Sequence, residues 1–379
     1  MNLKKLKNLD WYLITAVMLL CIIGVISIGS ATHINLGEST STYYSQILWI
    51  SIGFFIMLFV SIVSLDFFSK FYIPIYIFNI LLLVAVLLFG HSAKGATRWL
   101  YFGPIGIQPS EFSKIMMIFC MAKIIDKNSQ KINNKLIILL LCVLTAVPII
   151  LIQKQPSLSA SMVLLAIVAV QLFVGGISYK YISLAIIIVV PLLFFIGFDI
   201  LKEDPLIVDK VFRPHQISRI LTFLRPEAND DSYYQTMKSI SAIGSGRITG
   251  KGLYQGTLNQ LSYLPEPYND FIFSVIGEEF GFVGCMVVLV LEFFIVFRCI
   301  VIAMNARSNF YQLCVVGVAG MIAFQTFVNT GVATGILPNT GMSLPFVSYG
   351  GSSMWTNMAS IGLVLNVHMM RSKSIFAEV

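Results

Sequence analysis

The chain has 379 residues, of which 57% are hydrophobic and only 11% are charged, and its mean hydropathy is +0.85. Soluble domains carry roughly 25% charged residues, so this composition excludes a water-soluble globular protein. The formal net charge of +7 at pH 7 does not indicate a nucleic-acid-binding protein, because the chain has no soluble basic domain. Polytopic membrane proteins concentrate Lys and Arg in their cytoplasmic loops, and such loops account for the positive charge.

The cysteines and histidines do not indicate a metal centre. All six cysteines lie in apolar stretches and none belongs to a C-x-x-C pair, which is typical of cysteines that act as small hydrophobes. The four histidines are far apart and have no zinc-ligand spacing. The first apolar stretch is about as long as a full span and no small-residue cleavage site follows it, so we interpret it as a retained helix and not as a signal peptide.

Long apolar stretches predict an all-α polytopic membrane protein with about ten transmembrane helices. The predicted spans cover residues 11–30, 46–65, 71–90, 111–125, 136–152, 159–174, 181–200, 271–302, 310–332 and 344–368. Seven spans precede the long polar interval 201–269, and three follow it. We therefore expect residues 1–379 to form a single integral membrane domain with a large loop between helices 7 and 8.

The positions of Lys and Arg predict the orientation in the membrane. In the short loops these cations fall on one side, at Lys4, Lys5, Lys7, Lys70, Lys127, Lys131, Lys135, Lys180, Arg298, Arg307, Arg371 and Lys373. By the positive-inside rule this side is cytoplasmic, and the opposite loops 31–45 and 329–343 contain no Lys or Arg. The sequence thus predicts a multi-pass protein of the cytoplasmic membrane, with both termini cytoplasmic and residues 201–269 outside.

The loop at residues 94–110 reads KGATRWLYFGPIGIQPS. Its cations and aromatic rings, Lys94, Arg98, Trp99 and Tyr101, are typical of an anchor at the membrane surface. Contact with a substrate is the alternative role for this group.

The helix that follows this loop begins with ionisable residues. Ser110 is its expected N-cap, and Glu111 and Lys114, three residues apart, share one helix face. Ionisable side chains at membrane depth need a partner or a wet cavity. The pair is therefore either an internal salt bridge or part of a polar cleft.

The large loop contains an amphipathic pattern with one sign of charge. Apolar side chains recur at residues 217, 220, 221 and 224, among the cations Lys210, Arg213, Arg219 and Arg225. This spacing predicts an amphipathic helix lying in the membrane interface. Its cations either anchor the helix at anionic headgroups or grip a pyrophosphate, for which Arg forks are suited.

Residues 244–252, GSGRITGKG, superficially resemble a nucleotide-binding P-loop. Gly252 stands where a P-loop has Ser or Thr, and the segment is expected outside the cell, so we reject that interpretation. A flexible loop that places Arg247 and Lys251 near a lipid phosphate is the better hypothesis.

Asp270 is the last polar residue before the chain re-enters the membrane, in the run LPEPYNDFIFSVIGEEFG. It is either an ordinary N-cap or a carboxylate at the water–lipid boundary that accepts a proton from a substrate hydroxyl. Further on, Gly277, Gly281 and Gly284 form a stripe of small residues at helical spacing. The stripe serves either internal packing or docking of a partner's transmembrane helix.

Three long runs are similar to the signature blocks of the SEDS family, named for shape, elongation, division and sporulation. They are KGATRWLYFGPIGIQPSEFSK, LPEPYNDFIFSVIGEEFGFVG and LPFVSYGGSS, and they are spread along the whole chain. Residues 241–266 and 341–371 resemble the rod-shape members of the family more closely than the division members. One difference is clear, because residues 155–159 read QPSLS where the family usually reads QPDLG. The missing carboxylate at Ser157 puts a charge pair in doubt, which Lys114 would be placed to make.

The resemblance implies a ten-helix polymerase that joins lipid II disaccharide-pentapeptides into glycan strands for cell elongation. It also implies a class B penicillin-binding transpeptidase as partner, membrane lipids as surroundings, and no nucleic acid. The family's essential loop aspartate falls on Asp270, and its RW and QPSE positions fall on residues 98–99 and 108–111.

Glycosyl transfer from an undecaprenyl-pyrophosphate donor needs a base for the attacking hydroxyl and positive charge for the leaving pyrophosphate. We predict that Asp270 is the base. The predicted substrate-binding residues are Lys94, Arg98, Trp99, Glu111, Lys114, Arg213, Arg219, Lys251 and Glu266. No cofactor is evident; a divalent cation, Mg²⁺ or Mn²⁺, is compatible with this chemistry, although the sequence has no dedicated cage for it. A flippase or transporter of the lipid-linked precursor, a polymerase dedicated to division, and a non-catalytic scaffold for a cell-wall complex are the alternatives.

Overall fold

The computed structural model describes residues 9–32, 39–93, 96–103, 105–202, 214–224 and 230–375. Within these residues, ten helices are 17 residues long or longer. They are α1 (Trp11–Ala31), α2 (Ser39–Ile62), α4 (Tyr72–Phe89), α5 (Pro109–Lys127), α6 (Lys135–Lys154), α7 (Leu158–Val174), α8 (Tyr179–Ile200), α13 (Ile272–Met304), α14 (Asn309–Ala333) and α15 (Gly351–Ile375). The expected all-α polytopic fold is confirmed.

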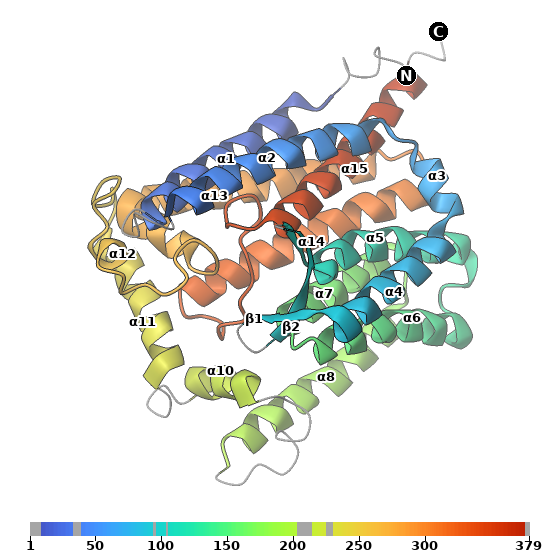
Figure 1. The fold of residues 1–379 in the computed structure, drawn as a ribbon. Coiled ribbons are helices and arrows are strands. Elements are labelled where there is room, and N and C mark those ends of the chain that lie inside the picture. Colours follow the sequence, from blue (N-terminus) through green and yellow to red (C-terminus); the bar gives the residue numbers. More distant parts are fainter. Residues whose placement is uncertain are drawn as a thin grey trace.

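Seven of the described helices, α1, α2, α4, α6, α8, α13 and α14, are long and apolar enough to cross a membrane. The helix α7 is apolar but shorter, and α5 and α15 occupy the other two predicted positions. The start of α1 and the end of α15 lie at the same end of the bundle (Figure 1). Both ends of a chain lie on the same side when the chain crosses the membrane an even number of times.

The last predicted span begins seven residues too early. Residues 344–350 form an irregular loop, and α15 starts at Gly351. Pro345 has no N–H to donate, and Phe346 and Gly350 have φ angles of +60° and +155°, so this apolar run is not helical. A short helix that we did not predict, α3 (Leu65–Lys70), follows α2.

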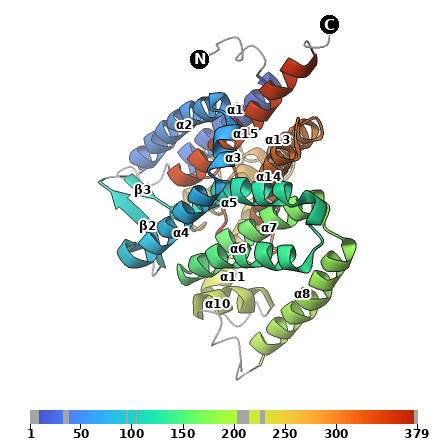
Figure 2. The ribbon, with the colours of Figure 1, turned by 90° about the vertical axis from the view of Figure 1, so that its right-hand side faces the viewer.

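The helix α14 lies at the centre of the bundle, packed against α13, α7 and α5, while α2 packs against α15 and α1 against α13. By contrast, α8 lies at the edge of the bundle (Figure 2). Most of its apolar side chains are exposed, among them Ile187 and Phe194, which are 67% and 77% exposed. Apolar side chains in this position suit contact with lipid.

The loop between α8 and α13 folds into three further helices, α10 (Pro214–Leu224), α11 (Asp230–Ser245) and α12 (Thr257–Gln260). They lie at the end of the bundle opposite to the start of α1 (Figures 1 and 2). The predicted amphipathic helix corresponds to α10, and its location in the membrane interface stays a prediction.

Three short strands precede α5: β1 (His91–Ala93), β2 (Ala96–Phe102) and β3 (Ile105–Ile107). They form an antiparallel sheet in the order β1-β2-β3, in which Trp99 of β2 pairs with His91 and Leu100 with Ile107. We predicted a loop here and not a sheet. The sheet carries Arg98 and Trp99 and thereby fixes their positions.

Gly281 interrupts α13 with a φ angle of +66°. A methyl group at this residue would lie 2.4 Å from the backbone nitrogen of Gly250, and one at Gly277 would lie 2.9 Å from Cγ1 of Ile243. Residues 243–250 of the same chain therefore cover this glycine face. The alternative in which the stripe receives a partner's helix is wrong for these two glycines; they serve internal packing.

Candidate functional site

Asp270 stands directly before the N-terminal end of α13. The first intrahelical bonds, from the amides of Ser274 and Val275, go to the carbonyl oxygen of Phe271 at 3.0 and 3.3 Å. Phe271 is therefore the N-cap residue. The alternative in which Asp270 caps the helix is wrong, and the half-buried aspartate needs another explanation.

The carboxylate of Asp270 and the guanidinium of Arg219 face the same point. A methyl group at Gly341 would lie 3.4 Å from Oδ2 of Asp270 and 3.3 Å from Nη1 of Arg219. Arg219 comes from α10, and Gly341 lies in the loop between α14 and α15. Three segments that are far apart in sequence thus bring a candidate base and a cation together.

A pocket of about 390 Å³, including its mouth, lies beside this point. It is lined by Arg98 of β2, by Arg219 and Ile220 of α10, by Pro156, Leu158 and Ser159 at the start of α7, and by Pro338, Asn339 and Thr340 of the α14–α15 loop. Two of the predicted cations, Arg98 and Arg219, therefore line one cavity. Two guanidinium groups favour an anionic ligand such as a phosphate.

Arg98 also attaches the sheet to the turn before α7. Its Nε donates a hydrogen bond to the carbonyl of Gln155 at 3.2 Å, and its Nη2 donates to the carbonyl of Pro156. Trp99, which is half-buried, packs on β3, where a methyl group at Gly106 would lie 3.2 Å from Cε3 of the indole. The sheet and the turn together form one wall of the pocket.

Glu111 and Lys114 form a buried ion pair, with Nζ of Lys114 2.6 Å from Oε1 of Glu111 and the two side chains 11% and 3% exposed, respectively. Of the two alternatives, the internal salt bridge is the arrangement found. The helix α5 begins at Pro109 with Gln108 as its N-cap, so the prediction of Ser110 as N-cap is wrong. Proline is favoured at the first helical position because its φ is preset and its missing N–H is not needed there.

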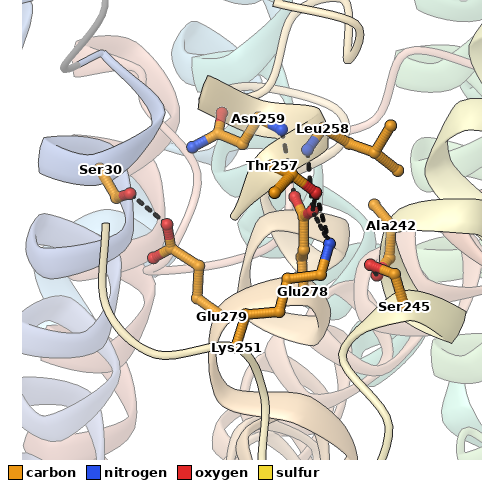
Figure 3. Close-up of polar contacts among 9 residues, drawn as sticks. All are labelled: Ser30, Ala242, Ser245, Lys251, Thr257, Leu258, Asn259, Glu278 and Glu279. Atoms are coloured by element: carbon orange, nitrogen blue, oxygen red, sulfur yellow. Dashed lines mark hydrogen bonds and ion pairs between the residues drawn. The ribbon is translucent and has the colours of Figure 1, made fainter. Parts of the chain in front are cut away.

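Lys251 is bonded within the protein and does not line the pocket. Its Nζ lies 2.6 Å from Oε1 of Glu278 and 2.7 Å from Oγ1 of Thr257 (Figure 3). The same carboxylate accepts hydrogen bonds from the backbone amides of Leu258 and Asn259 at 2.8 and 3.1 Å. Glu278 thus holds the first turn of α12, and this role uses Lys251 as its counter-charge.

The neighbouring carboxylate, Glu279, accepts a hydrogen bond from the hydroxyl of Ser30 in α1 (Figure 3). Glu266 accepts one from the side-chain amide of Asn269 at 2.9 Å, within the segment that leads to Asp270. Lys94 and Arg213 lie outside the described residues, as do Lys210 and Arg225.

The described part of the chain has no group of three His, Cys, Asp or Glu side chains arranged to hold a metal ion. The pocket lining contains two arginines and no carboxylate. Such a lining does not fit a divalent cation held by the protein alone, so a cation bridging pyrophosphate and carboxylate stays a prediction.

Two parts of the site were not predicted. We had assigned no role to residues 338–340, although they line the pocket, nor to Asn329 of α14. The only signals in the sequence were a loop without Lys or Arg and the LPFVSYGGSS run that follows it.

Comparison with known proteins supports one family. A sequence model of the cell cycle proteins FtsW, RodA and SpoVE matches residues 8–373. The probable peptidoglycan glycosyltransferase FtsW of Wigglesworthia glossinidia brevipalpis is 34% identical over 377 residues, which are 96% of this chain and 95% of that protein. The peptidoglycan glycosyltransferase MrdB of Escherichia coli K12 is 37% identical over 310 residues, which are 79% of each chain.

A solved structure described as "Structural coordination of polymerization and crosslinking by a peptidoglycan synthase complex" superposes with a TM-score of 0.80 at 29% identity. The match covers 96% of this chain and 98% of the other. The similarity therefore extends over the membrane helices and the loop that carries the candidate site.

Proposed function

Because the chain belongs to the FtsW, RodA and SpoVE family and is a peptidoglycan glycosyltransferase, we propose that it polymerises lipid II on the outer face of the cytoplasmic membrane. The observation that carries this proposal is the convergence of the Asp270 carboxylate and the Arg219 guanidinium beside Gly341, next to a pocket lined by two arginines. This reaction requires a base and a positively charged site that binds the leaving anion.

In the proposed reaction, Asp270 accepts the proton of the acceptor sugar's hydroxyl as its oxygen attacks the anomeric carbon of the donor. The new glycosidic bond forms while the bond to the pyrophosphate oxygen breaks, and the pyrophosphate leaves with the electron pair. Arg98 and Arg219 stabilise the negative charge that develops on this leaving group. No other group is needed to balance the step.

Cell elongation is the role that we propose, rather than division. Residues 241–266 and 341–371 carry the resemblance to the rod-shape members of the family. Expression in a rod-shaped bacterium depleted of its elongation polymerase is expected to restore the rod shape. Rescue only of a strain depleted of its division polymerase would instead support the division role.

The proposed orientation places both termini in the cytoplasm and the α10–α12 segment outside. The cations of the short loops support this orientation, as does the position of the start of α1 and the end of α15 at one end of the bundle. Labelling of single cysteines introduced at Arg247 and at Arg307 with an impermeant thiol reagent tests it, in a background in which Cys142, the exposed cysteine, is replaced. Arg247 is expected to be accessible from outside the cell and Arg307 from inside.

A class B penicillin-binding transpeptidase is the proposed partner, since the structural neighbour with a TM-score of 0.80 comes from a complex described as performing both polymerization and crosslinking. We expect the chain to be weakly active or inactive alone. An interfacial segment with many glycines gains order when a partner docks on it.

The test is conversion of purified lipid II to glycan strands by the purified protein, with and without the cognate transpeptidase. Polymer is expected with the partner and little without it. Equal rates in both states would exclude activation by the partner. Translocation of lipid II across vesicles without any polymer would overturn the polymerase assignment in favour of a flippase.

A further inference from the structure

Asn329 of α14 joins the segment that contains Asp270 to the loop that contains Gly341 and Met342. Its Nδ2 donates hydrogen bonds to the backbone carbonyl of Asp270 at 2.9 Å and to that of Met342 at 2.7 Å. The side chain is buried, with 1% of the residue exposed. A carboxamide nitrogen carries two hydrogens, and each is used to hold one of the segments.

The carbonyls on either side are held in the same way. The carbonyl of Asn269 accepts a hydrogen bond from the hydroxyl of Ser348 at 2.7 Å, and that of Tyr268 accepts one from the amide of Tyr349 at 2.9 Å. Three consecutive carbonyls, at residues 268, 269 and 270, are therefore fixed by α14 and the loop before α15. Consecutive carbonyls that are bonded in this way leave the backbone little freedom to rotate.

The hydrogen bond from Asn329 to the carbonyl of Met342 connects this arrangement to the proposed reaction. Met342 directly follows Gly341, the residue at which the Asp270 carboxylate and the Arg219 guanidinium meet. One amide group thus ties the backbone of Asp270 to the loop that contains Gly341. If Asn329 served only to pack α14, its amide would not need to donate both hydrogen bonds to carbonyls outside that helix.

We propose that Asn329 is a positioning residue that holds the Asp270 carboxylate against the Gly341 loop, in the orientation in which it accepts the substrate's proton. This inference rests on the proposed function. It assigns Asn329 no contact with substrate, so turnover depends on it while binding of lipid II does not.

Asn329→Asp tests the proposal with almost no change in shape, because an ionised carboxylate only accepts hydrogen bonds and cannot serve two carbonyls. Misplacement by about 1 Å costs roughly 100-fold in rate. In the complex with the transpeptidase, we expect kcat to fall by about 10- to 100-fold and the KM for lipid II to change by less than about twofold. Asn329→Gln retains both hydrogens on a longer arm and is expected to recover part of kcat.

Gln325→Leu is the matched control. Gln325 is a carboxamide one turn earlier on the same helix, it is also 1% exposed, and its Oε1 accepts no hydrogen bond from the described residues. Its replacement is expected to leave kcat and KM near those of the parent protein. Equal losses for Gln325→Leu and Asn329→Asp would reduce Asn329 to a general packing role and overturn the proposal.

Asn329→Ser is a second variant, small and uncharged, for the case in which the buried carboxylate of Asn329→Asp prevents folding. A folded variant of either kind with the parental kcat refutes the inference, as does a rise in KM that matches the loss of kcat. The parent complex and Asp270→Asn belong in the same assay. A parent that makes no polymer defeats the proposed function, whereas an active parent with unaffected Asn329 variants defeats only this inference.

Discussion

The side chains of Arg219 and Asp270 both reach the point beside Gly341 that an added methyl group would occupy. Nη1 of Arg219 and Oδ2 of Asp270 lie 3.3 and 3.4 Å from the position that a methyl group of residue 341 would occupy. Gly341 also has a φ angle of +68°, which side chains other than glycine rarely adopt. The backbone conformation therefore favours glycine at this position, and an added methyl group would come into contact with both side chains.

Gly341→Ala is expected to lower polymerisation by about tenfold, because the added methyl group contacts Oδ2 of Asp270 and Nη1 of Arg219 and shifts the proposed base, and misplacement by about 1 Å costs roughly 100-fold in rate. Gly176→Ala is the matched control, since Gly176 has a φ angle of +85° and no neighbour within 4 Å of an added methyl group. The control bears the same kind of backbone strain without the contact. Similar activity of the two variants would mean that the space beside Gly341 is not used.

Asp270→Asn is expected to abolish glycan polymerisation while the protein remains folded. The amide keeps the size of the carboxylate but is not a useful base, and loss of a general base typically costs about 10² to 10⁴ in rate. The control is Asp126→Asn. Asp126 lies at the C-terminal end of α5, where its carboxylate pairs with Lys123 at 3.4 Å. Polymer formation by purified Asp270→Asn at the parental rate would contradict the assignment of Asp270 as the base.

Arg219→Ala is expected to weaken the use of lipid II, with a higher KM and a lower kcat, because in the proposed reaction the guanidinium holds the pyrophosphate in both the ground state and the transition state. Arg219→Lys restores charge without the planar fork and is expected to recover activity only in part. Arg307→Ala, at an exposed arginine after α13, serves as the control. Arg213→Ala offers the same test at the second predicted cation, which lies outside the described residues. Unchanged kinetics for both alanine variants would leave α10 with membrane anchoring as its role.

Hydropathy was sufficient to predict the membrane helices, since a span of about 20 apolar residues has few other structures available in lipid. It failed at residues 344–350, where an apolar run is an irregular loop. The reason is long-range: Gln46 of α2 donates a hydrogen bond to the carbonyl of Ser348 and accepts one from the amide of Gly350, both at 3.3 Å. A buried partner 300 residues away satisfies backbone groups that a local pattern assigns to a helix.

Residue type identified Asp270, Arg98 and Arg219 as candidates, but not their neighbours. Asn329 is an uncharged residue at the end of an apolar span, and nothing in its local sequence indicates that both of its amide hydrogens leave the helix. Lys251 is the opposite case. Its charge predicted contact with a phosphate, which stays a prediction, and the sequence did not indicate that a buried carboxylate 27 residues later forms an ion pair with it.

Glu278 provides a test of that pairing through stability. Its side chain is fully buried, and its two oxygens accept hydrogen bonds from Lys251, Thr257, Leu258 and Asn259. Removing a buried acceptor leaves each donor with a desolvation cost of its own. We expect Glu278→Ala to lower the free energy of unfolding by about 2 to 4 kcal/mol, measured by thermal or denaturant unfolding of the purified protein in detergent.

Lys251→Ala is expected to cost less than Glu278→Ala, because the carboxylate then keeps its bonds to the backbone amides of α12 and the lysine side chain is 24% exposed. Asp126→Asn is the control here too, since it breaks an ion pair whose side chains are 25% and 29% exposed, and such pairs contribute about 0 to 1 kcal/mol. The order Glu278→Ala, Lys251→Ala, Asp126→Asn, from the largest loss to the smallest, follows if Glu278 organises α12. A loss for Lys251→Ala that equals or exceeds the loss for Glu278→Ala would contradict this order, and would mean that the lysine and not the carboxylate is the centre of the network.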